Sequence, residues 1–359
     1  MTLEIIWQQK LSKERYFTTN HNRSAMKKLK TILLILLTAT FVQGQNYEQI
    51  DNYVRALEFK SNVDLAEMAE EITAKSNTDE ERLRAIFVWI AHNIEYDVKS
   101  FKSGKIPNST AIGVVQKGRA VCEGYSNLFQ ELASNVGIKS LIVSGFSKGY
   151  GYQNRKKLET SDHAWNIVLL NNDWYLIDAT WGAGHLNMRG RYVPAMQEKY
   201  FMADPAFFVT EHLPEDPAMQ LLPCPIKPKE FLQDSSKVLK IARSKEKCYS
   251  YRDTLAAYIQ LDTVQQKVAS AERMYRYFND NVYKPAILLN QAAYAYSKPL
   301  NDGSVELDKK LELAQKSLKY YKRAEEILSG AARPHERDLK RMVKQNIANV
   351  EKFIDFYKK

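Results

Sequence analysis

The sequence predicts an α+β domain, in which one helix packs on an antiparallel sheet, followed by an all-α domain. Three observations support this fold class. Apolar residues at helical spacing follow Cys122, segments rich in β-branched and aromatic residues occupy 139–181, and almost no strand signal remains after residue 231. The domain boundaries that we predict are 1–44 for a leader, 45–230 for the α+β domain and 231–359 for the helical domain.

The leader contains the segment MKKLKTILLILLTATFVQG at residues 26–44, which has the layout of a secretory signal peptide: a basic start, an apolar run and small residues at the end. The apolar run from Thr31 to Val42 has 12 residues, whereas a spanning helix needs about 20. We therefore expect translation to start at Met26, the protein to be secreted or periplasmic, and no permanent membrane anchor.

The charge of the chain gives no sign of a nucleic-acid partner. The formal net charge is +10, but residues 1–44 hold seven basic and two acidic residues and so account for +5 of it. The remaining charge is spread without long basic runs, arginine-rich segments or aromatic residues interleaved with basic ones. These are the features that nucleic-acid binding requires, so we expect no such partner.

The elements before Cys122 are predicted to be helices and a loop. Residues 47–75 are amphipathic at helical spacing. The next segment, NTDEERLRAIFVWIAHNIEYD, begins with a capping box from Thr78 to Glu81 and continues as a helix with a buried face. Residues 97–118 contain four helix breakers, namely Gly104, Pro107, Gly113 and Gly118, and are predicted to be rich in loops.

Cys122 lies in the first turn of the next predicted helix, on the side of its apolar face, and Gly137 is placed to end that helix. A cysteine in this position is a buried core residue, half of a disulfide, or a nucleophile. Cys224 and Cys248 are 24 residues apart and are able to pair, which would leave Cys122 free. The apolar face of the helix consists of Tyr125, Leu128, Phe129, Leu132 and Val136.

Two paired strands follow. KSLIVSGFSKG is a first strand, and HAWNIVLLNNDWYLIDATWG is a hairpin whose strands are 163–170 and 174–181. If a two-residue turn is closed by Leu170 and Asp173, Asp178 lies opposite Trp165 and diagonal to His163, at roughly 7–8 Å. A three-residue turn would place His163 and Asp178 on opposite faces.

These positions suit acyl transfer by a cysteine, which needs a thiolate, a base and a group that orients the base. A helix N-terminus stabilises the thiolate, and the backbone N–H of Cys122 is a natural oxyanion donor. His163 is then the base and Asp178 the orienting carboxylate. The rival residues are Asp162, which points to the other strand face, His185 in a glycine-rich loop, and His92 on the earlier helix; Trp165 and Trp181 flank the site as lining or as core.

The end of the chain is predicted to be extended and then helical. Residues 205–228 hold six prolines and are expected to wrap around the first domain. From residue 231 the chain is rich in lysine and tyrosine. LLNQAAYAYSKPL followed by LDKKLELAQKSLKYYKRAEEIL is typical of a helical hairpin, but no clean repeat of about 34 residues is present. A helical bundle and a degenerate repeat both remain open.

The segments IFVWIAHNIEYD, CEGYSNLFQELASNVGI, DHAWNIVLLNNDWYLIDATWG and YFMADPAFFVTEHLPEDPAMQLL resemble the transglutaminase-like superfamily, in its kyphoscoliosis-peptidase branch. The resemblance covers residues 79–222. It implies a papain-like core with Cys122 as nucleophile, His163 as base and Asp178 as orienting carboxylate. The family's second oxyanion donor is not evident from the sequence; the candidates are Gln116, Tyr96 and Trp89.

Together, the residues and the resemblance predict an exported cysteine enzyme that hydrolyses a peptide or amide bond in a protein or peptide substrate. The alternatives are a non-catalytic binding module with the same fold and a transglutaminase proper. The sequence has no CxxC or CxxH spacing for zinc and no calcium-loop pattern, so we expect no metal and no cofactor. We expect a protein partner for the C-terminal helices.

Overall fold

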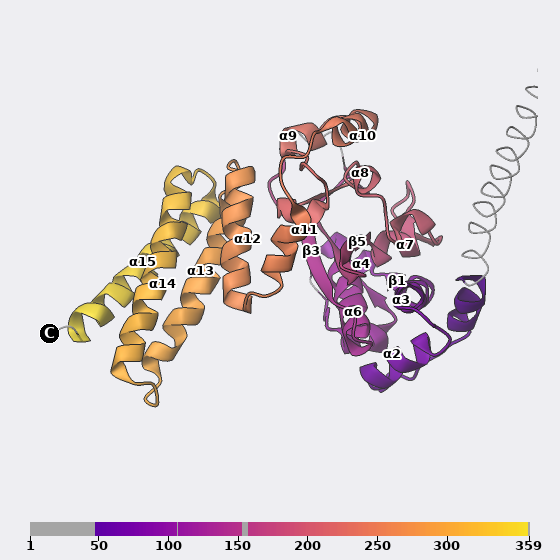
Figure 1. Cartoon of the computed structure of the whole chain (residues 1–359), viewed down its shortest axis with the longest axis horizontal. Helices are drawn as coiled ribbons and strands as arrows, with labels where there is room; N and C mark the ends of the chain where they lie inside the picture. The colour runs from indigo at the N-terminus through magenta and orange to yellow at the C-terminus, as the bar shows by residue number, and fades with distance from the viewer. Residues whose placement is uncertain (1–46, 106, 153–156, 358–359) are drawn as a thin grey trace, which may run out of the picture.

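The computed structural model describes residues 47–105, 107–152 and 157–357. The predicted leader lies outside these residues. The described chain forms two lobes: an α+β lobe at the N-terminal side and a lobe of long helices at the C-terminal side (Figure 1). In the described ranges no helix combines the length and the apolar character needed to cross a membrane.

Helices cover one side of the α+β lobe. The segment predicted as one amphipathic stretch forms two helices, at residues 47–55 and at Leu65–Thr73 (α2). The helix Asp79–Asn93 (α3) begins at Thr78, whose Oγ1 accepts the N–H of Glu81 at 3.2 Å, as a capping residue should. Helix α3 is buried along most of its length because α2 and the core elements pack around it.

The stretch 97–118 is not a loop throughout, and this corrects the prediction. It contains two short helices, Val98–Ser103 (α4) and Ala111–Lys117 (α5). Gly104 and Gly118 follow these helices with φ angles of 65° and 61°, so they are left-handed helix ends. Glycine in this sequence therefore ends helices at positions where we expected loop.

The central sheet has four antiparallel strands in the order β5-β4-β3-β8. Its hairpin closes with Leu170 opposite Asp173, and Asn171 and Asn172 form the two-residue turn with φ angles of 51° and 63°. The predicted two-residue turn is thus confirmed. The strands are Ser140–Ser147 (β3), His163–Leu170 (β4), Asp173–Ile177 (β5) and His212–Pro214 (β8).

The predicted second hairpin strand ends earlier than expected. After Ile177 the chain turns into a short helix, Ala179–Ala183 (α7), and Asp178 caps it. The aspartate stops the strand because its side chain accepts the first N–H groups of α7. A small hairpin follows, formed by Gly184–Leu186 (β6) and Tyr192–Pro194 (β7), and then the 3₁₀ turn Glu198–Tyr200 (η1).

The helix Cys122–Asn135 (α6) packs on β3 and β4 with its predicted apolar face buried. The side chain of Asn166 on β4 donates to the backbone oxygen of Ser126 at 3.1 Å and so joins the helix to the sheet. The residues before the helix are held as well, since Arg119–Ala120 (β2) pairs in parallel with Glu95–Tyr96 (β1). The hydrogen bond to β4 and the pairing of β2 with β1 together fix where α6 starts.

The proline-rich segment packs on the other face of the sheet and contributes a strand to it, but it is not the extended connection that we predicted. It forms Pro205–Phe208 (α8), β8, Pro217–Gln220 (η2) and Pro228–Phe231 (α9). Strand β8 extends the sheet at the free edge of β3. Cys224 and Cys248 form a disulfide, which settles the pairing that the sequence left open.

The apolar packing changes from one lobe to the other after residue 231. Ser235–Ser244 (α10) and Tyr251–Tyr258 (α11) belong with the α+β lobe: Val238 packs with Leu213 in one apolar cluster, and Leu255 with Trp174 in another. A separate apolar cluster begins with the helix that follows, Thr263–Tyr277 (α12). The domain boundary that we predicted at residue 231 therefore lies too early, because α10 and α11 still pack on the α+β lobe.

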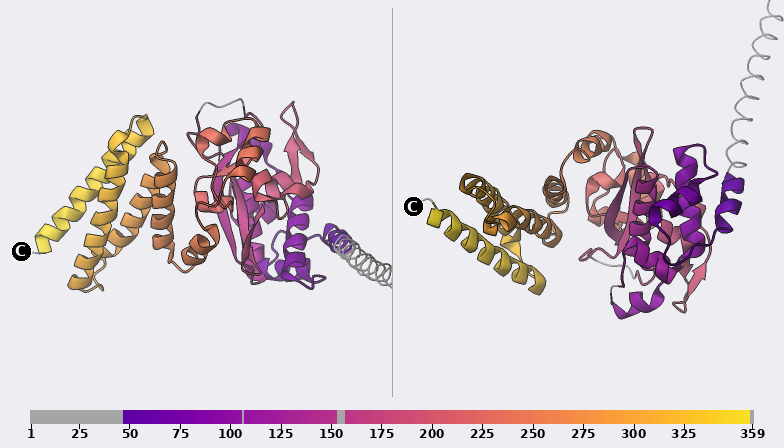
Figure 2. Two further views of the ribbon diagram at one scale, coloured as in Figure 1. Left: turned by 45° about the horizontal axis from the view of Figure 1, so that its top comes forward. Right: turned by 90° about the horizontal axis from the view of Figure 1, so that it is seen from below.

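The C-terminal lobe consists of α12, Tyr283–Ser297 (α13), Leu307–Ile327 (α14) and Pro334–Tyr357 (α15), each packed on the next (Figure 2). The predicted helical hairpin is the α13–α14 pair, where Ser317 Oγ donates to the backbone oxygen of Ala293 at 2.8 Å. Short 3₁₀ turns, Lys298–Asn301 (η3) and Leu328–Gly330 (η4), lie at the connections.

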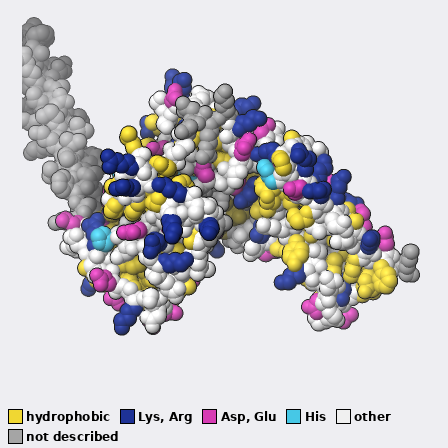
Figure 3. All heavy atoms as spheres, turned by 180° about the vertical axis from the view of Figure 1, so that it is seen from behind, with side chains coloured by type: hydrophobic (Ala, Val, Ile, Leu, Met, Phe, Trp, Pro, Cys, Tyr) yellow, Lys and Arg dark blue, Asp and Glu magenta, His cyan; other side chains and the backbone are white. Residues whose placement is uncertain are grey.

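Buried ion pairs join the two lobes. Asp216, which is 4% exposed, accepts from Arg273 Nη2 at 2.6 Å and from Ser270 Oγ at 2.8 Å, both on α12. Glu215 lies 3.4 Å from Lys284 Nζ on α13. The lobes lie side by side in the space-filling view, with lysine and arginine side chains scattered over both (Figure 3).

Candidate active site

Cys122 is the first residue of α6 and is half-buried and free. The N-cap residue Val121 offers no side-chain acceptor, so the first N–H groups of the helix stay available for a ligand. The helix end supplies partial positive charge beside the sulfur, which favours a thiolate. The backbone N–H of Cys122 itself lies at the start of this helix, where a developing oxyanion would be bound.

His163 is the first residue of β4 and lies close enough to Cys122 for the cysteine to raise the pKa of the imidazole. Its Nε2 lies 2.8 Å from Asp178 Oδ2, so the nitrogen left for the sulfur is Nδ1. The strand partner of His163 is Gly145, and a Cβ at that position would lie 2.4 Å from the backbone oxygen of Leu213. Glycine is therefore required for β8 to approach the sheet behind the histidine.

Asp178 is fully buried and has both carboxylate oxygens occupied. Its Oδ1 accepts the backbone N–H groups of Thr180 at 2.9 Å and Trp181 at 3.0 Å. Its Oδ2 contacts the Nε2 atoms of His163 at 2.8 Å and of His212 at 3.0 Å. A carboxylate held by four donors has one orientation, and that orientation fixes the imidazole of His163.

The electrostatics of the site favour a protonated His163 beside an ionised Asp178. Burial lowers the pKa of His163, but the charge of Asp178 and the contact with Cys122 outweigh it and raise the pKa to about 10. Burial raises the pKa of Asp178, but the two histidines outweigh it and hold the pKa well below its ordinary value. His163 is thus an imidazolium and Asp178 a carboxylate over the neutral pH range.

The structure brings the three predicted site residues together. It leaves the rivals apart from them. Asp162 lies at the rim of the cleft and is bound by the N–H of Ser147 at 2.8 Å. His185 is exposed on the cleft wall, and His92 is exposed on α3.

The structure also distinguishes between the three candidates for the second oxyanion donor. Trp89 donates its Nε1–H to the backbone oxygen of Leu57 at 3.3 Å, which excludes it. Gln116 is exposed on α5 and does not line the cleft. Tyr96 lines the cleft, and the nearby charges of Cys122 and Asp178 add to burial in raising the pKa of its phenol, so the hydroxyl stays protonated as a donor.

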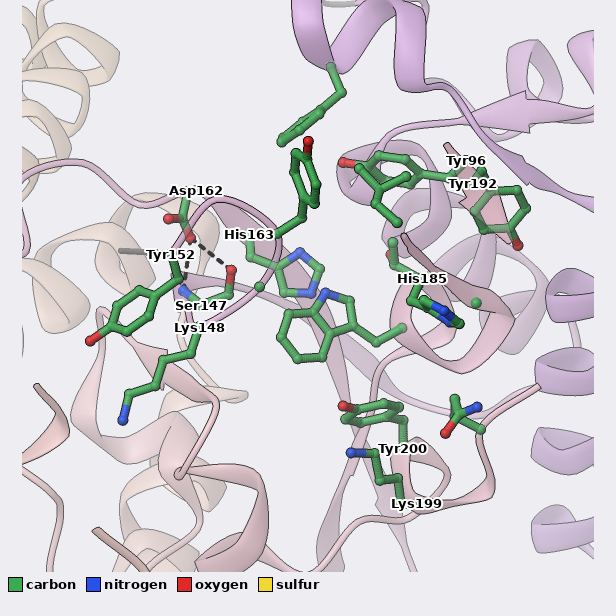
Figure 4. Close-up of a pocket in the computed structure, with 18 residues that line it drawn as sticks. Tyr96, Ser147, Lys148, Tyr152, Asp162, His163, His185, Tyr192, Lys199 and Tyr200 are labelled. Carbon is green, nitrogen blue, oxygen red and sulfur yellow. Dashed lines mark hydrogen bonds between the residues drawn. The ribbon is translucent and has the colours of Figure 1, made fainter. Parts of the chain in front are cut away.

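A cleft of about 500 Å³ opens beside His163 (Figure 4). In the close-up, Tyr96 and Tyr192 lie on one side of His163, Lys199 and Tyr200 on another, and Lys148 and Tyr152 beyond Asp162. Trp181 lines the cleft, whereas Trp165 is fully buried in the core. The aromatic side chains of the lining are Tyr96, Phe101, Tyr150, Tyr152, Trp181, Tyr192 and Tyr200.

Sequence reasoning missed His212. It lies 34 residues after Asp178, in a three-residue strand within the proline-rich segment, and is fully buried. No local pattern distinguishes a histidine in such a short strand. The one available signal was that it falls inside the last segment that resembles the family.

His163, Asp178 and His212 together offer donor atoms within 4.8 Å of one another, which is the spacing of a metal site. However, Asp178 Oδ2 is already at hydrogen-bond distance from both Nε2 atoms, at 2.8 and 3.0 Å. A metal ion needs each ligand at about 2.0–2.2 Å from itself, and here the two N–H groups occupy that space. Hydrogen bonds account for the cluster, and metal independence stays a prediction.

Residues 66–179 match the model of the transglutaminase-like superfamily, so the chain carries a domain of that superfamily. The matched range contains Cys122, His163 and Asp178. The papain-like arrangement described above, with a cysteine-bearing helix on an antiparallel sheet, is the fold that the sequence predicted.

Among curated proteins, the chain is 33% identical to the human kyphoscoliosis peptidase (Homo sapiens) over 189 residues, which are 52% of this chain and 28% of the relative. It is 30% identical to the Lim and transglutaminase domain protein ltd-1 of Caenorhabditis elegans over 182 residues, 45% of this chain and 24% of the relative. The chain is 26% identical to hillarin of Drosophila melanogaster over 203 residues, which are 52% of this chain and 24% of the relative. The similarities support the kyphoscoliosis-peptidase-like branch, and the chain spans only about a quarter of the length of each relative.

Proposed function

We propose that this protein is a cysteine-dependent acyl-transfer enzyme that hydrolyses a peptide or amide bond in a protein or peptide substrate. The observation that supports it most directly is that Cys122 at the start of α6 lies near His163, whose Nε2 binds Asp178 Oδ2 at 2.8 Å beside an aromatic cleft. These residues are the three groups that thioester chemistry needs, in the required order.

In the first half of the reaction, the thiolate of Cys122 attacks the substrate carbonyl carbon and forms a C–S bond. The carbonyl oxygen becomes an oxyanion, which accepts from the backbone N–H of Cys122 and from the phenol of Tyr96. The imidazolium of His163 then gives its Nδ1 proton to the leaving nitrogen. The C–N bond breaks, the amine departs and a thioester remains on Cys122.

In the second half, His163 is neutral and accepts a proton from water at Nδ1. The hydroxide equivalent attacks the thioester carbon, the C–S bond breaks, and the acid product leaves. Asp178 stays ionised in both halves, because it holds the Nε2–H of His163 and stabilises the imidazolium each time it forms.

Water is a better second substrate for this cleft than a lysine amine. Lys148 and Lys199 line the cleft, and Asp162 is the single carboxylate among the described lining residues. The Oδ1 of that carboxylate already accepts the N–H of Ser147. A cationic amine therefore meets like charge at the cleft, which favours hydrolysis over amine transfer.

The first test is the rate of alkylation of Cys122 by iodoacetamide against pH, read by mass spectrometry. The disulfide leaves Cys122 as the one free thiol of the chain under non-reducing conditions. We expect fast labelling well below the ordinary thiol pKa of about 8.5, slowed in His163→Ala and unchanged in His185→Ala, which removes an exposed cleft histidine. Slow labelling in all three proteins would reject the enzyme and favour a non-catalytic binding module.

A second test separates hydrolysis from transfer. The protein is incubated with a glutamine-bearing protein and a labelled primary amine, and with a peptide library in water. Cleaved peptides without incorporated label are expected. Cross-linked or labelled product would identify a transglutaminase, and release of ammonia alone would identify deamidation.

We also propose that the protein is exported, on the signal-peptide pattern of residues 26–44. The disulfide between Cys224 and Cys248 supports this proposal, because disulfides persist in oxidising compartments. Cell fractionation followed by N-terminal sequencing would test it, and an intact leader on a protein retained with the cytosol would reject it. The protein partner of the C-terminal helices stays a prediction.

A further inference from the structure

His212 lies next to His163, with 5.3 Å between the ring centroids, and contacts the same carboxylate of Asp178. It begins β8, opposite Ser147 of β3, and its side chain is fully buried. Its Nε2 lies 3.0 Å from Asp178 Oδ2, the same oxygen that binds His163. The two imidazoles therefore share one acceptor atom.

Aromatic rings enclose His212 and fix its position. The ring of Phe208 stacks on it at 4.1 Å between centroids with 19° between the planes, and the ring of Trp181 lies at 4.3 Å. Trp165 and Tyr200 complete the enclosure at 5.2 and 5.8 Å. Such an apolar enclosure leaves the imidazole no room to turn and no water to bind.

The enclosure also fixes the protonation of His212. Within the described chain, the buried Nδ1 has no hydrogen-bond partner. A hydrogen bond to the carboxylate requires the proton on Nε2, so Nδ1 carries the lone pair. A second proton would place an N–H in apolar surroundings without an acceptor. Burial accordingly lowers the pKa of His212 and outweighs the attraction of Asp178.

We propose that His212 is a positioning residue that acts on His163 through Asp178, as a neutral donor that limits how tightly the carboxylate holds the imidazolium proton. The proposal rests on the proposed function of the site. A lysine or arginine in this place would cancel the charge of Asp178 and with it the stabilisation of the imidazolium. A neutral N–H of His212 draws electron density from Asp178 Oδ2, so this oxygen holds the proton of His163 less tightly. The carboxylate still keeps its negative charge.

The charged and titratable groups around His163 come from four elements. Cys122 faces it from α6, Asp178 from the start of α7, and His212 from β8. Tyr96 on β1 lies near Cys122 and stays protonated. Glu211 acts on His212 from the preceding position and is held by the hydroxyl of Tyr200 at 2.8 Å. Among these groups, His212 alone offers Asp178 a second side-chain N–H.

The test is the pH profile of Cys122 alkylation by iodoacetate, whose negative charge makes the rate depend on the imidazolium. The rate falls at high pH where His163 loses its proton, so the basic limb reports the pKa of His163. His212→Phe keeps a ring in the enclosure and removes the donor; His212→Gln places an amide N–H at the position of Nε2. His92→Phe, at an exposed histidine on α3 outside the cleft lining, is the matched control.

We expect the basic limb to move to higher pH by about half a unit to one unit in His212→Phe, which is a three- to tenfold higher rate on that limb. In His212→Gln and in the control His92→Phe, the basic limb should stay at the same pH as in the unchanged protein. A limb that does not move in a folded His212→Phe would overturn the inference. A profile without any basic limb in the unchanged protein would instead reject the proposed function, so the two failures are distinguishable.

The unchanged protein offers a second measurement, which does not depend on the folding of a variant. Nitrogen-15 NMR of the histidine rings should show His212 with a proton on Nε2 and a bare Nδ1 from about pH 5 to about pH 9, while His163 carries both protons. A doubly protonated His212 in that range, or one with its proton on Nδ1, would overturn the inference.

Discussion

Replacing Asp178 by asparagine should remove the charge that His163 carries at neutral pH in the unchanged protein. The asparagine oxygen would keep the two backbone N–H groups of α7 that Asp178 Oδ1 accepts. Its amide group would then face the Nε2 atoms of His163 and His212 as a donor. His163 would have to carry its proton on Nδ1, toward Cys122, where it is unable to accept the thiol proton.

The magnitude follows from the pKa of His163. It is about 10 in the protein, and without the carboxylate the burial of the ring leaves it at or below the ordinary 6.5. At pH 8 the imidazolium fraction should fall from about 99% to about 3%, a loss of about 30-fold. The iodoacetate rate at pH 8 should fall by at least that factor. Asp162→Asn, which removes a carboxylate at the rim of the cleft, is the control and should leave the rate within twofold.

The same substitution has a consequence for stability. The pKa of His163 in the folded protein lies above its ordinary value, so protonation stabilises the native state. This contribution is complete below about pH 6.5 and is lost as the pH rises through about 10. The melting temperature of the unchanged protein should therefore decline between these values. Asp178→Asn should lack that decline; a variant that kept it, together with fast alkylation at pH 8, would refute the reasoning.

Three further changes test the scaffold and the site. Gly145→Ala places a Cβ 2.4 Å from the backbone oxygen of Leu213, so denaturant unfolding should show a loss of about 2–3 kcal/mol; an unchanged midpoint would contradict the packing of β8. Tyr96→Phe should lower turnover on the order of 100-fold while alkylation of the thiol stays unchanged, and equal turnover would remove Tyr96 as oxyanion donor. Cys224→Ser, which opens the 24-residue link to Cys248, should cost about 3 kcal/mol in non-reducing calorimetry, whereas a variant as stable as the oxidised protein would show that the disulfide is not a support.

The proximity of His163 and Asp178 and the position of Cys122 at a helix start were predictable because they depend on short-range rules. The alternation of side chains along a hairpin placed Asp178 beside His163 once the turn had two residues, and the Asn171–Asn172 turn is one of the few sequences that readily takes two left-handed residues. The position of Cys122 followed from helical spacing and the glycine at the other end of the helix.

The other parts depend on contacts that no local pattern reveals. Strand β8 has three residues and exists because the edge of β3 is open to it, so His212 was invisible in the sequence. Gly118 has the same appearance whether it breaks a helix or ends one, and the choice depends on the packing of α5 against α6. An aspartate is a common helix-capping residue, so the cap of α7 by Asp178 could have been predicted. The apolar pattern of 174–181 instead led us to predict a strand through this position.

The segment that begins with His212 has a second attachment four residues later. Asp216 is buried and bound by Arg273, and Glu215 is buried beside Lys284. A fragment that ends before Thr263 would lose both cations, Arg273 and Lys284, and with them the two ion pairs that join this segment to the C-terminal lobe. The C-terminal helices therefore contact the same short segment, residues 212–216, that contributes His212 to the candidate site.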